Sequence, residues 1–239
     1  MAERELKIIS EARTTLNDKN PNNYRWKDER LMELLSDAQD DMCKAIPLIT
    51  RKATINPSVG QVEYQLPDDS VKLLSASSSG HSLTITSEDE IERYNVGWED
   101  EVAGEYAKVI VNELSQQTIR PYPALSMGTV ANPLKVRYHA MPIRLGWEDG
   151  AIVEELEVNS MWDLGLKQYV IGMAFLDYGD EFSVSRSQTA IGIYNKEYTS
   201  AKKLAKKAFA KRVRTTEFQG KVANSRYVGG RYGSGNCRY

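Results

Sequence analysis

The sequence predicts an α+β protein, a helical bundle with an inserted, mostly antiparallel β domain and an extended basic C-terminal tail. Three observations lead to this prediction. Apolar residues recur at three-and-four spacing near the start of the chain, at alternate positions through its middle, and at three-and-four spacing again towards its end. Aliphatic residues become scarce after Arg214. The net charge changes sign near Lys202.

The first two elements are predicted to be helices. Residues 2–16 favour a short helix, which the turn-forming residues 17–23 end. Residues 27–49 favour a longer helix: acids in its first turns suit the helix dipole, and Pro47 should break it near its end. Its apolar stripe consists of Leu31, Leu34, Leu35, Ala38, Met42, Ala45, Ile46 and Ile49.

The helical period is lost over residues 53–145. Alternation of apolar and polar residues there predicts short strands, bounded by turns rich in Gly, Ser and Pro. The predicted strands are 59–67, 71–76, 82–86, 107–114, 118–120 and 134–139. Ser87 and Glu90 have the spacing of a capping box, which predicts one helical turn at residues 91–94.

Two further helices are predicted after the β region, over residues 160–179 and 186–212. The residues that follow are rich in Gly, Ser, Arg and Tyr, and alone they cannot bury enough apolar surface to fold. The predicted organisation is therefore a helical bundle of residues 1–52 and 155–212, an inserted β-rich domain of 53–154, and an extended tail of 213–239.

The charge is divided unevenly along the chain. Residues 202–239 carry eleven Lys or Arg and one acid, a net charge of +10. Residues 1–201 carry twenty Lys or Arg and thirty-two Asp or Glu, a net charge of −12. Such a split indicates a terminal segment that contacts something the body does not. The candidate binding residues are Lys211, Arg212, Arg214, Arg226, Tyr227, Arg231, Tyr232, Arg238 and Tyr239.

These residue types leave three interpretations open. Arg offers a planar fork for carboxylates or phosphates, and Tyr offers a rigid amphipathic anchor. The tail could contact nucleic acid, with rings on bases and guanidinium groups on phosphates. It could instead become ordered in an acidic groove of a protein partner, or it could be an unused flexible end.

Little in the chain indicates catalysis. Two distant cysteines, Cys43 and Cys237, exclude a disulfide framework and a Cys-rich zinc site, and neither His81 nor His139 has a partner at metal-ligand spacing. Phosphate-binding loops, the nucleophile elbow and the zinc-protease motif are absent from the sequence. We therefore expect no enzyme, no cofactor and no metal site.

The remaining polar residues have structural roles in this interpretation. His139 belongs to an alternating strand pattern and is expected at the surface, and Cys43 is expected to be structural. The paired acids are expected on a solvated helix face and in a turn; they are Asp40–Asp41 and Asp68–Asp69. The charged start of the chain is unlike a signal peptide, and the longest stretch without a charge, 73–87, holds six serines, so we expect no membrane span.

Several motifs occur in an order and spacing that resemble one known family. Tyr24-Arg-Trp-Lys-Asp-Glu-Arg-Leu31 is similar to its Arg-Trp-x-Asp entry to the main helix. Val59–Asp68 is similar to its Gly-x-x-x-Tyr-x-Leu-Pro strand, and residues 120–123 and 136–142 are similar to its pair of strand ends. The family is that of the phage head-to-tail adaptors, or connectors, which includes tail tubular protein A of short-tailed phages.

The resemblance implies a structural subunit of an adaptor ring, expected to be a dodecamer, that joins the portal of a tailed-phage head to the tail and continues the DNA channel. Its partners would be copies of itself, the portal protein, a downstream tail or nozzle protein, and double-stranded DNA that passes without specific binding, with no membrane. It would act in tail assembly and DNA ejection at the head–tail junction of the virion, after synthesis in the host cytoplasm.

In this family the C-terminal segments reach the portal, which implies that the basic tail is portal-binding. The acidic body fits a channel that lets DNA slide, because cationic walls would bind phosphates strongly. The alternative is a nucleic-acid-binding packaging or capsid-associated protein that uses the basic Arg/Gly/Tyr tail.

Overall fold

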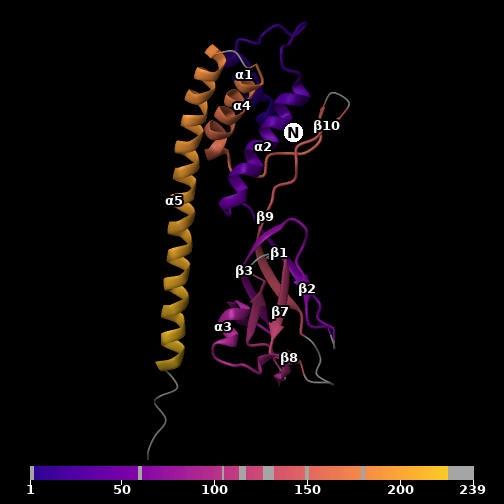
Figure 1. The fold of residues 1–239 in the computed structure, drawn as a ribbon, viewed down its shortest axis with the longest axis vertical. Coiled ribbons are helices and arrows are strands. Elements are labelled where there is room, and N and C mark those ends of the chain that lie inside the picture. Colours follow the sequence, from indigo (N-terminus) through magenta and orange to yellow (C-terminus); the bar gives the residue numbers. More distant parts are fainter. Residues whose placement is uncertain are drawn as a thin grey trace, which may run out of the picture. The chain divides into compact units, whose positions relative to one another are not determined.

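The computed structural model describes residues 3–58, 61–103, 105–112, 117–125, 132–148, 151–178 and 181–225, of which 209–225 by backbone alone (Figure 1). The chain divides into two compact units, Met1–Tyr198 and Thr199–Tyr239. The first unit combines helices with β-sheet, which confirms the predicted α+β class.

Three helices of the first unit pack on one another: α1 (Glu3–Leu16), α2 (Asp28–Ala45) and α4 (Asp163–Tyr178). Their buried core includes Ile8, Ala12, Leu31, Leu34, Leu35, Ala38, Met42, Leu166, Val170 and Ala174. The ion pairs Arg4–Asp163 and Lys167–Glu11 connect α1 to α4. All three helices were predicted, and α2 ends at Ala45 because Pro47 cannot continue it.

A seven-stranded sheet, in the order β1-β9-β3-β4-β6-β7-β2, occupies the middle of the chain. Its strands are β1 (Thr50–Ile55), β2 (Tyr64–Gln65), β3 (Ser70–Ser78), β4 (His81–Thr86), β6 (Lys108–Val111), β7 (Thr118–Tyr122) and β9 (Leu134–Ala140). The pairs are antiparallel except for β4 with β6, which confirms a mostly antiparallel region. One face is buried and contributes Leu73, Leu83, Val109, Ile119, Val136 and Tyr138 to the core.

The helix α3 (Glu88–Glu92) and the short helix η1 (Trp98–Asp100) follow β4 and lie against the β6–β7 hairpin. Ile91 and Trp98 form a small core with Ile110, and the Tyr122 ring packs edge-on against Trp98, with centroids 6.1 Å apart. The hydroxyl of Ser87 accepts a hydrogen bond from Glu90 N at 3.3 Å, which confirms Ser87 as the N-cap, but the helix begins directly after it, at Glu88, and not at Ile91 as predicted.

Two short strand pairs complete the unit. β5 (Val102–Ala103) pairs with β8 (Ala124–Leu125), and β10 (Trp147–Glu148) pairs with β11 (Ala151–Ile152). The helix η2 (Ser160–Trp162) leads into α4. The tetrapeptide Gly-Trp-Glu-Asp occurs twice in the sequence, at residues 97–100 and 146–149. A helix begins at Trp98 and a strand begins at Trp147, so the repeat marks no structural duplication.

The last helix is longer than predicted. α5 runs from Glu181 to Ser225, whereas the sequence pattern predicted a helix over 186–212 and an extended tail from residue 213. The prediction of an extended chain is therefore wrong for residues 213–225. Only five of these thirteen residues are strong helix formers, and the segment includes Thr215, Thr216 and Gly220, so its composition did not indicate a helix. The segment continues a helix that begins at Glu181, and extending an existing helix costs less than nucleating one. Residues 226–239 lie outside the described part of the chain.

Two predictions of surface positions are also wrong. His139 does lie in a strand, β9, but it is only 4% exposed because the end of α2 covers it, and its Nε2 has no hydrogen-bond partner among the described residues. Asp40 is mostly buried and pairs with Arg144, and Asp41 accepts a hydrogen bond from Tyr194. Sequence periodicity places residues on a helix face, but it does not show what later segments cover that face.

Candidate attachment helix

The first part of α5 lies close against α4 because glycines remove side chains from the contact. A Cβ built on Gly172 would lie 2.7 Å from both Cδ1 and Cγ1 of Ile191, and one on Gly165 would lie 3.1 Å from Cβ of Glu197. Cβ atoms do not approach other atoms as closely as 2.7 Å without displacement. The two glycines, spaced seven residues apart on one face of α4, therefore form a seat for α5.

Tyrosines extend this contact along α5. The Tyr194 ring lies 5.1 Å from the ring of Tyr169 in α4 and 6.0 Å from that of Tyr198. The Tyr194 hydroxyl donates a hydrogen bond to Oδ2 of Asp41 in α2. Burial and, secondarily, this hydrogen bond raise the pKa of Tyr194, so the phenol keeps its proton and acts as a donor. One residue of α5 thus contacts both α2 and α4.

Near the beginning of α5, the Arg186 side chain lies close to two phenylalanine rings. The Arg186 guanidinium lies 4.1 Å from the ring centroid of Phe182 and 5.7 Å from that of Phe175. Phe182 is nevertheless 65% exposed, so one side of this aromatic pair stays open to solvent. These contacts hold the N-terminal part of α5, up to Tyr198, within the first unit.

Beyond Tyr198, α5 belongs to the second unit and carries a basic stripe. Lys202, Lys203, Lys206 and Lys207 are all exposed. At 100° per residue they cover an arc of roughly 140° on one side of the helix. The helix also exposes Leu204, at 49%. None of these four lysines forms an ion pair with a residue in the described part of the chain.

The candidate binding residues predicted from the sequence fall into two groups in the structure. Lys211, Arg212 and Arg214 are part of the helix α5. They do not belong to an extended chain. The other six lie outside the described residues: Arg226, Tyr227, Arg231, Tyr232, Arg238 and Tyr239. Sequence reasoning missed the seat of α5, although Gly165 and Gly172 at seven-residue spacing within a predicted helix were a visible signal of close packing.

The Arg-Trp-x-Asp motif at the start of α2 is a buried polar junction. The guanidinium of Arg13 in α1 donates to Oδ2 of Asp18 at 2.6 Å, to the carbonyl of Trp26 at 2.9 Å and to Oδ1 of Asp28 at 2.5 Å. The ring of Tyr24 lies 3.6 Å from Cζ of Arg13. The motif therefore fixes the turn between α1 and α2 around one cation.

The other motif residues fix the strand ends. The Tyr64 hydroxyl donates to the carbonyl of Gln61 at 2.8 Å and accepts from Ser58 N at 3.1 Å, which holds the loop before β2. The Tyr138 hydroxyl donates to Oδ1 of Asp69 at 3.0 Å, and Asp69 also pairs with Arg51. The motif residues thus serve the architecture of the first unit.

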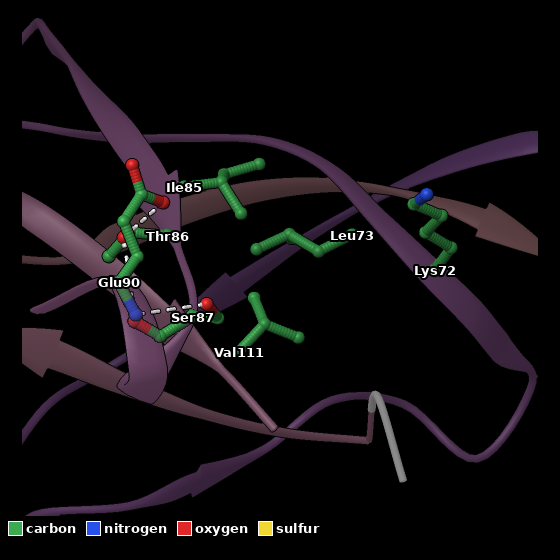
Figure 2. A pocket seen from close by; sticks show the side chains of 7 residues that line it. All are labelled: Lys72, Leu73, Ile85, Thr86, Ser87, Glu90 and Val111. Atoms are coloured by element: carbon green, nitrogen blue, oxygen red, sulfur yellow. Dashed lines mark hydrogen bonds between the residues drawn. The ribbon is translucent and has the colours of Figure 1, made fainter. Parts of the chain in front are cut away.

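A pocket of about 260 Å³ opens where β3 and β4 separate. It is lined by Lys72, Leu73, Ile85, Thr86, Ser87, Glu90 and Val111. Figure 2 shows the aliphatic side chains between Lys72 at one end and Glu90 at the other. The Thr86 hydroxyl donates to Oε2 of Glu90 at 2.8 Å, and the Ser87 hydroxyl caps α3. Both hydroxyls therefore act in holding α3 against the sheet.

The buried cysteine is unreactive. Burial raises the pKa of the Cys43 thiol to about 12, so little thiolate forms near neutral pH. Within the described residues, no group of three or more His, Cys, Asp or Glu side chains could hold a metal ion. None of the described helices has the length and apolar character needed to cross a membrane.

The described residues form an α+β unit and a long helix, α5, whose residues after Tyr198 belong to a second unit and are rich in Lys and Arg. In a comparison with protein families, the family model described as SU10 adaptor protein matches residues 6–223. The chain belongs to the SU10 adaptor protein family, and it is a phage structural adaptor. No curated protein matches the chain. The finer resemblance to tail tubular protein A stays a prediction.

Proposed function

We propose that this adaptor is a ring subunit that joins the portal of a tailed-phage head to the tail and continues the DNA channel, without catalysing a reaction. Membership of the adaptor family over residues 6–223 is the observation that carries this proposal. An adaptor of this family interacts with other head or tail proteins and belongs in the virion. The particular partners proposed are further copies of the chain, a portal protein and a downstream tail or nozzle protein.

The basic part of α5 is the proposed portal-binding element. Lys202, Lys203, Lys206 and Lys207 form an exposed stripe with no acidic partner among the described side chains. Lys211, Arg212 and Arg214 follow on the same helix, and the Arg-Tyr pairs of residues 226–239 come after it. An acidic surface on the portal would neutralise these positive charges. Each ring would repeat the contact in every subunit, so modest individual contacts would add up as avidity.

The ring itself requires two different faces on each subunit, because subunits in a ring meet head to tail. We propose a twelve-fold ring in which both the helices α1, α2 and α4 and the sheet contribute to these faces. Electron microscopy of assembled particles tests this proposal. Closed rings with one repeated interface are expected, and an isologous dimer as the assembled form would contradict it.

Attachment is tested with heads filled with DNA but lacking the adaptor. The full chain should join these heads, whereas the variant Lys202→Gln/Lys203→Gln/Lys206→Gln/Lys207→Gln should stay in solution, as measured by sedimentation of heads. The matched control, Lys7→Gln/Lys19→Gln/Lys27→Gln/Lys44→Gln, also removes four exposed positive charges, from α1, α2 and the turn between them, and should attach normally. Normal attachment of the α5 variant would overturn the role given to this helix.

The alternative function, a nucleic-acid-binding packaging or capsid-associated protein, makes a different prediction for the same variant. A basic stripe that holds DNA would lose affinity steeply with salt. If the α5 lysines were needed for binding to free duplex DNA but not for attachment to heads, the alternative would replace the adaptor ring as the function of this segment.

A further inference from the structure

One face of the sheet carries a cluster of cations that the sequence pattern did not bring together. In β9 the side chains alternate, so Lys135 and Arg137 lie on one face while Val136 and Tyr138 lie in the core. Directly paired residues share a face. The partners of Lys135 are Thr54 in β1 and Ser77 in β3, and those of Arg137 are Lys52 and Ser75.

The register extends this face over four strands, and we call it the basic sheet face. One end of this face is His139, which pairs with Thr50 and Lys72 and lies buried under the end of α2. The other residues of the face are Thr50, Lys52 and Thr54 of β1, Lys135 and Arg137 of β9, Lys72, Ser75 and Ser77 of β3, and Ser82 and Thr84 of β4. Eight of these ten residues are exposed, and Arg137 and Ser77 are half-buried. The set contains four cations and six hydroxyls, with no carboxylate and no apolar side chain.

The four cations are not neutralised within the described part of the molecule. The ion pairs there involve other residues, and the one hydrogen bond given by Arg137 goes to the Thr50 hydroxyl at 3.2 Å. Residues 1–201 carry a net charge of −12, so this concentration of unpaired positive charge is local. Like charges so close repel one another, and an anionic partner would relieve this repulsion.

The composition of the face favours a polyphosphate over a protein. The centres of protein interfaces are enriched in aromatic residues and depleted in Lys, and this face has no apolar side chain. Contacts to a nucleic-acid backbone come from Arg, Lys, Ser and Thr, which are the residue types present here. Strands lie about 4.8 Å apart and residues on one face recur about every 6.7 Å, so the donors form a closely spaced grid.

We propose that the basic sheet face binds the phosphate backbone of double-stranded DNA without reading its sequence. The face is part of a sheet and presents no helix or ribbon that could enter the major groove, so it would hold phosphates only. Four cations limit the contact to about four phosphates, and such a contact is weak and strongly dependent on salt. DNA would be guided by this face and still slide.

The inference goes beyond the adaptor function, because it requires neither a ring nor a portal. The acidic composition of the body led us to expect that DNA slides past without specific binding and without cationic walls that hold its phosphates. The sheet register changes that expectation, because it collects Lys52, Lys72, Lys135 and Arg137 from three strands onto one surface. Their separation in the sequence hid the cluster.

The test is fluorescence anisotropy of a labelled 20-base-pair duplex with the full chain, between 50 and 200 mM salt. The variant Lys52→Gln/Lys135→Gln/Arg137→Gln should bind at least about tenfold more weakly at 50 mM salt, and the slope of log affinity against log salt should fall by roughly 2.7, since each neutralised phosphate contributes about 0.9. Circular dichroism should show an unchanged fold, because the substituted side chains do not lie in the core.

The controls separate this face from net charge and from α5. Lys7→Gln/Lys19→Gln/Lys27→Gln makes the same change in charge on exposed residues and should bind DNA within about twofold of the unsubstituted chain. Equal losses in both triple variants, unchanged binding by the sheet variant, or a loss confined to the four-lysine α5 variant would each overturn the proposal. Competition by polyglutamate as strong as by DNA would assign the face to an acidic protein instead. A failure of head attachment with DNA binding retained concerns only the adaptor function.

Discussion

Among single residues, Gln39 connects α2 to both ends of the segment between β9 and α4. Its side chain is fully buried, and its Oε1 accepts hydrogen bonds from Glu157 N at 2.8 Å and Val158 N at 3.2 Å. Its Nε2 donates to the carbonyl of Ile143 at 3.5 Å. One amide therefore joins α2 to the chain that follows β9 and to the chain that precedes α4.

Replacing Gln39 by Ala should lower the free energy of unfolding by roughly 2–4 kcal/mol, because two backbone donors would lose their acceptor in a mostly buried setting. Urea denaturation measures this change. The exposed Gln65→Ala provides a control and should shift stability by no more than about 0.5 kcal/mol. Equal midpoints for Gln39→Ala and the unsubstituted chain would show that water replaces the amide at no cost.

His139 should make stability depend on pH. Burial lowers its pKa, and Lys72 adds to this effect, while the backbone carbonyls of Cys43 and Ile46 oppose it. The folded state thus binds the proton less readily than the unfolded state. The stabilisation is present above the unfolded pKa of about 6.5 and is lost as the pH falls below it.

Unfolding by urea at pH 8 and pH 5 tests this expectation. His139→Gln cannot titrate and should show a smaller loss of stability between the two pH values than the unsubstituted chain, whereas His81→Gln, at an exposed position, should show the same loss as the unsubstituted chain. If His139→Gln retains the full pH dependence, the buried carboxyls rather than this imidazole are responsible.

Buried polar residues mark the limit of prediction at this scale. The sequence indicated that Trp26 and Asp28 begin a helix, but it gave no sign that Arg13 would hold both from the preceding helix. Contacts of this kind depend on the tertiary approach of segments, which periodicity does not encode. The pattern of apolar residues identified the helix cores, because that signal is local.

Between elements, the contact of α4 with α5 depends on missing side chains. Gly172→Ala should destabilise the protein by roughly 1–3 kcal/mol, because the new methyl group would overlap Ile191 and force it or the helices to move. Gly192→Ala is the matched control in α5, where a Cβ meets nothing within 4 Å. It should stabilise the helix by up to about 1 kcal/mol.

Denaturant unfolding monitored by circular dichroism compares the two glycine variants. Opposite signs are expected. A stabilising effect of both substitutions would mean that α5 moves away from α4 without cost and that the glycines form no seat.

The sequence predicted most elements, and the misses have identifiable causes. β1 was missed because its polar face and half-exposed second face leave little apolar alternation. The length of α5 was underestimated because the prediction relied on an apolar stripe, which the sequence of residues 213–225 does not contain. The parallel pairing of β4 with β6 was not predicted, since strand order is set by distant contacts.

For the whole molecule, the order and spacing of the motifs indicated a phage adaptor, and the family match confirms this class, whereas the resemblance to tail tubular protein A stays a prediction. The candidate binding residues were chosen from charge composition alone. That choice identified the basic end of the chain but overlooked the basic sheet face, whose cations are separated by up to 85 residues between Lys52 and Arg137. Charge counted along the sequence does not reveal a cluster formed by distant residues, and the strand register is needed to identify it.

The pairing of distant segments also determines when the chain can fold during its synthesis. β1 pairs with β9, and Arg4 of α1 pairs with Asp163 of α4, so the first elements made wait for the last before they can pack. At typical translation rates the delay between residues 4 and 163 is roughly 8–30 s. During that time the apolar faces of α1 and α2 and the edge of β1 lack their partners.

A chain released early should therefore remain unfolded, however many of its elements are complete. A fragment of residues 1–132 lacks both β9 and α4 and should be digested rapidly in limited proteolysis, whereas residues 1–198, which form the first unit, should resist. Protection of the shorter fragment would show that the N-terminal half folds alone. The protein is thus expected to fold only as a nearly complete chain, and until then the apolar surfaces of its N-terminal half are open to aggregation.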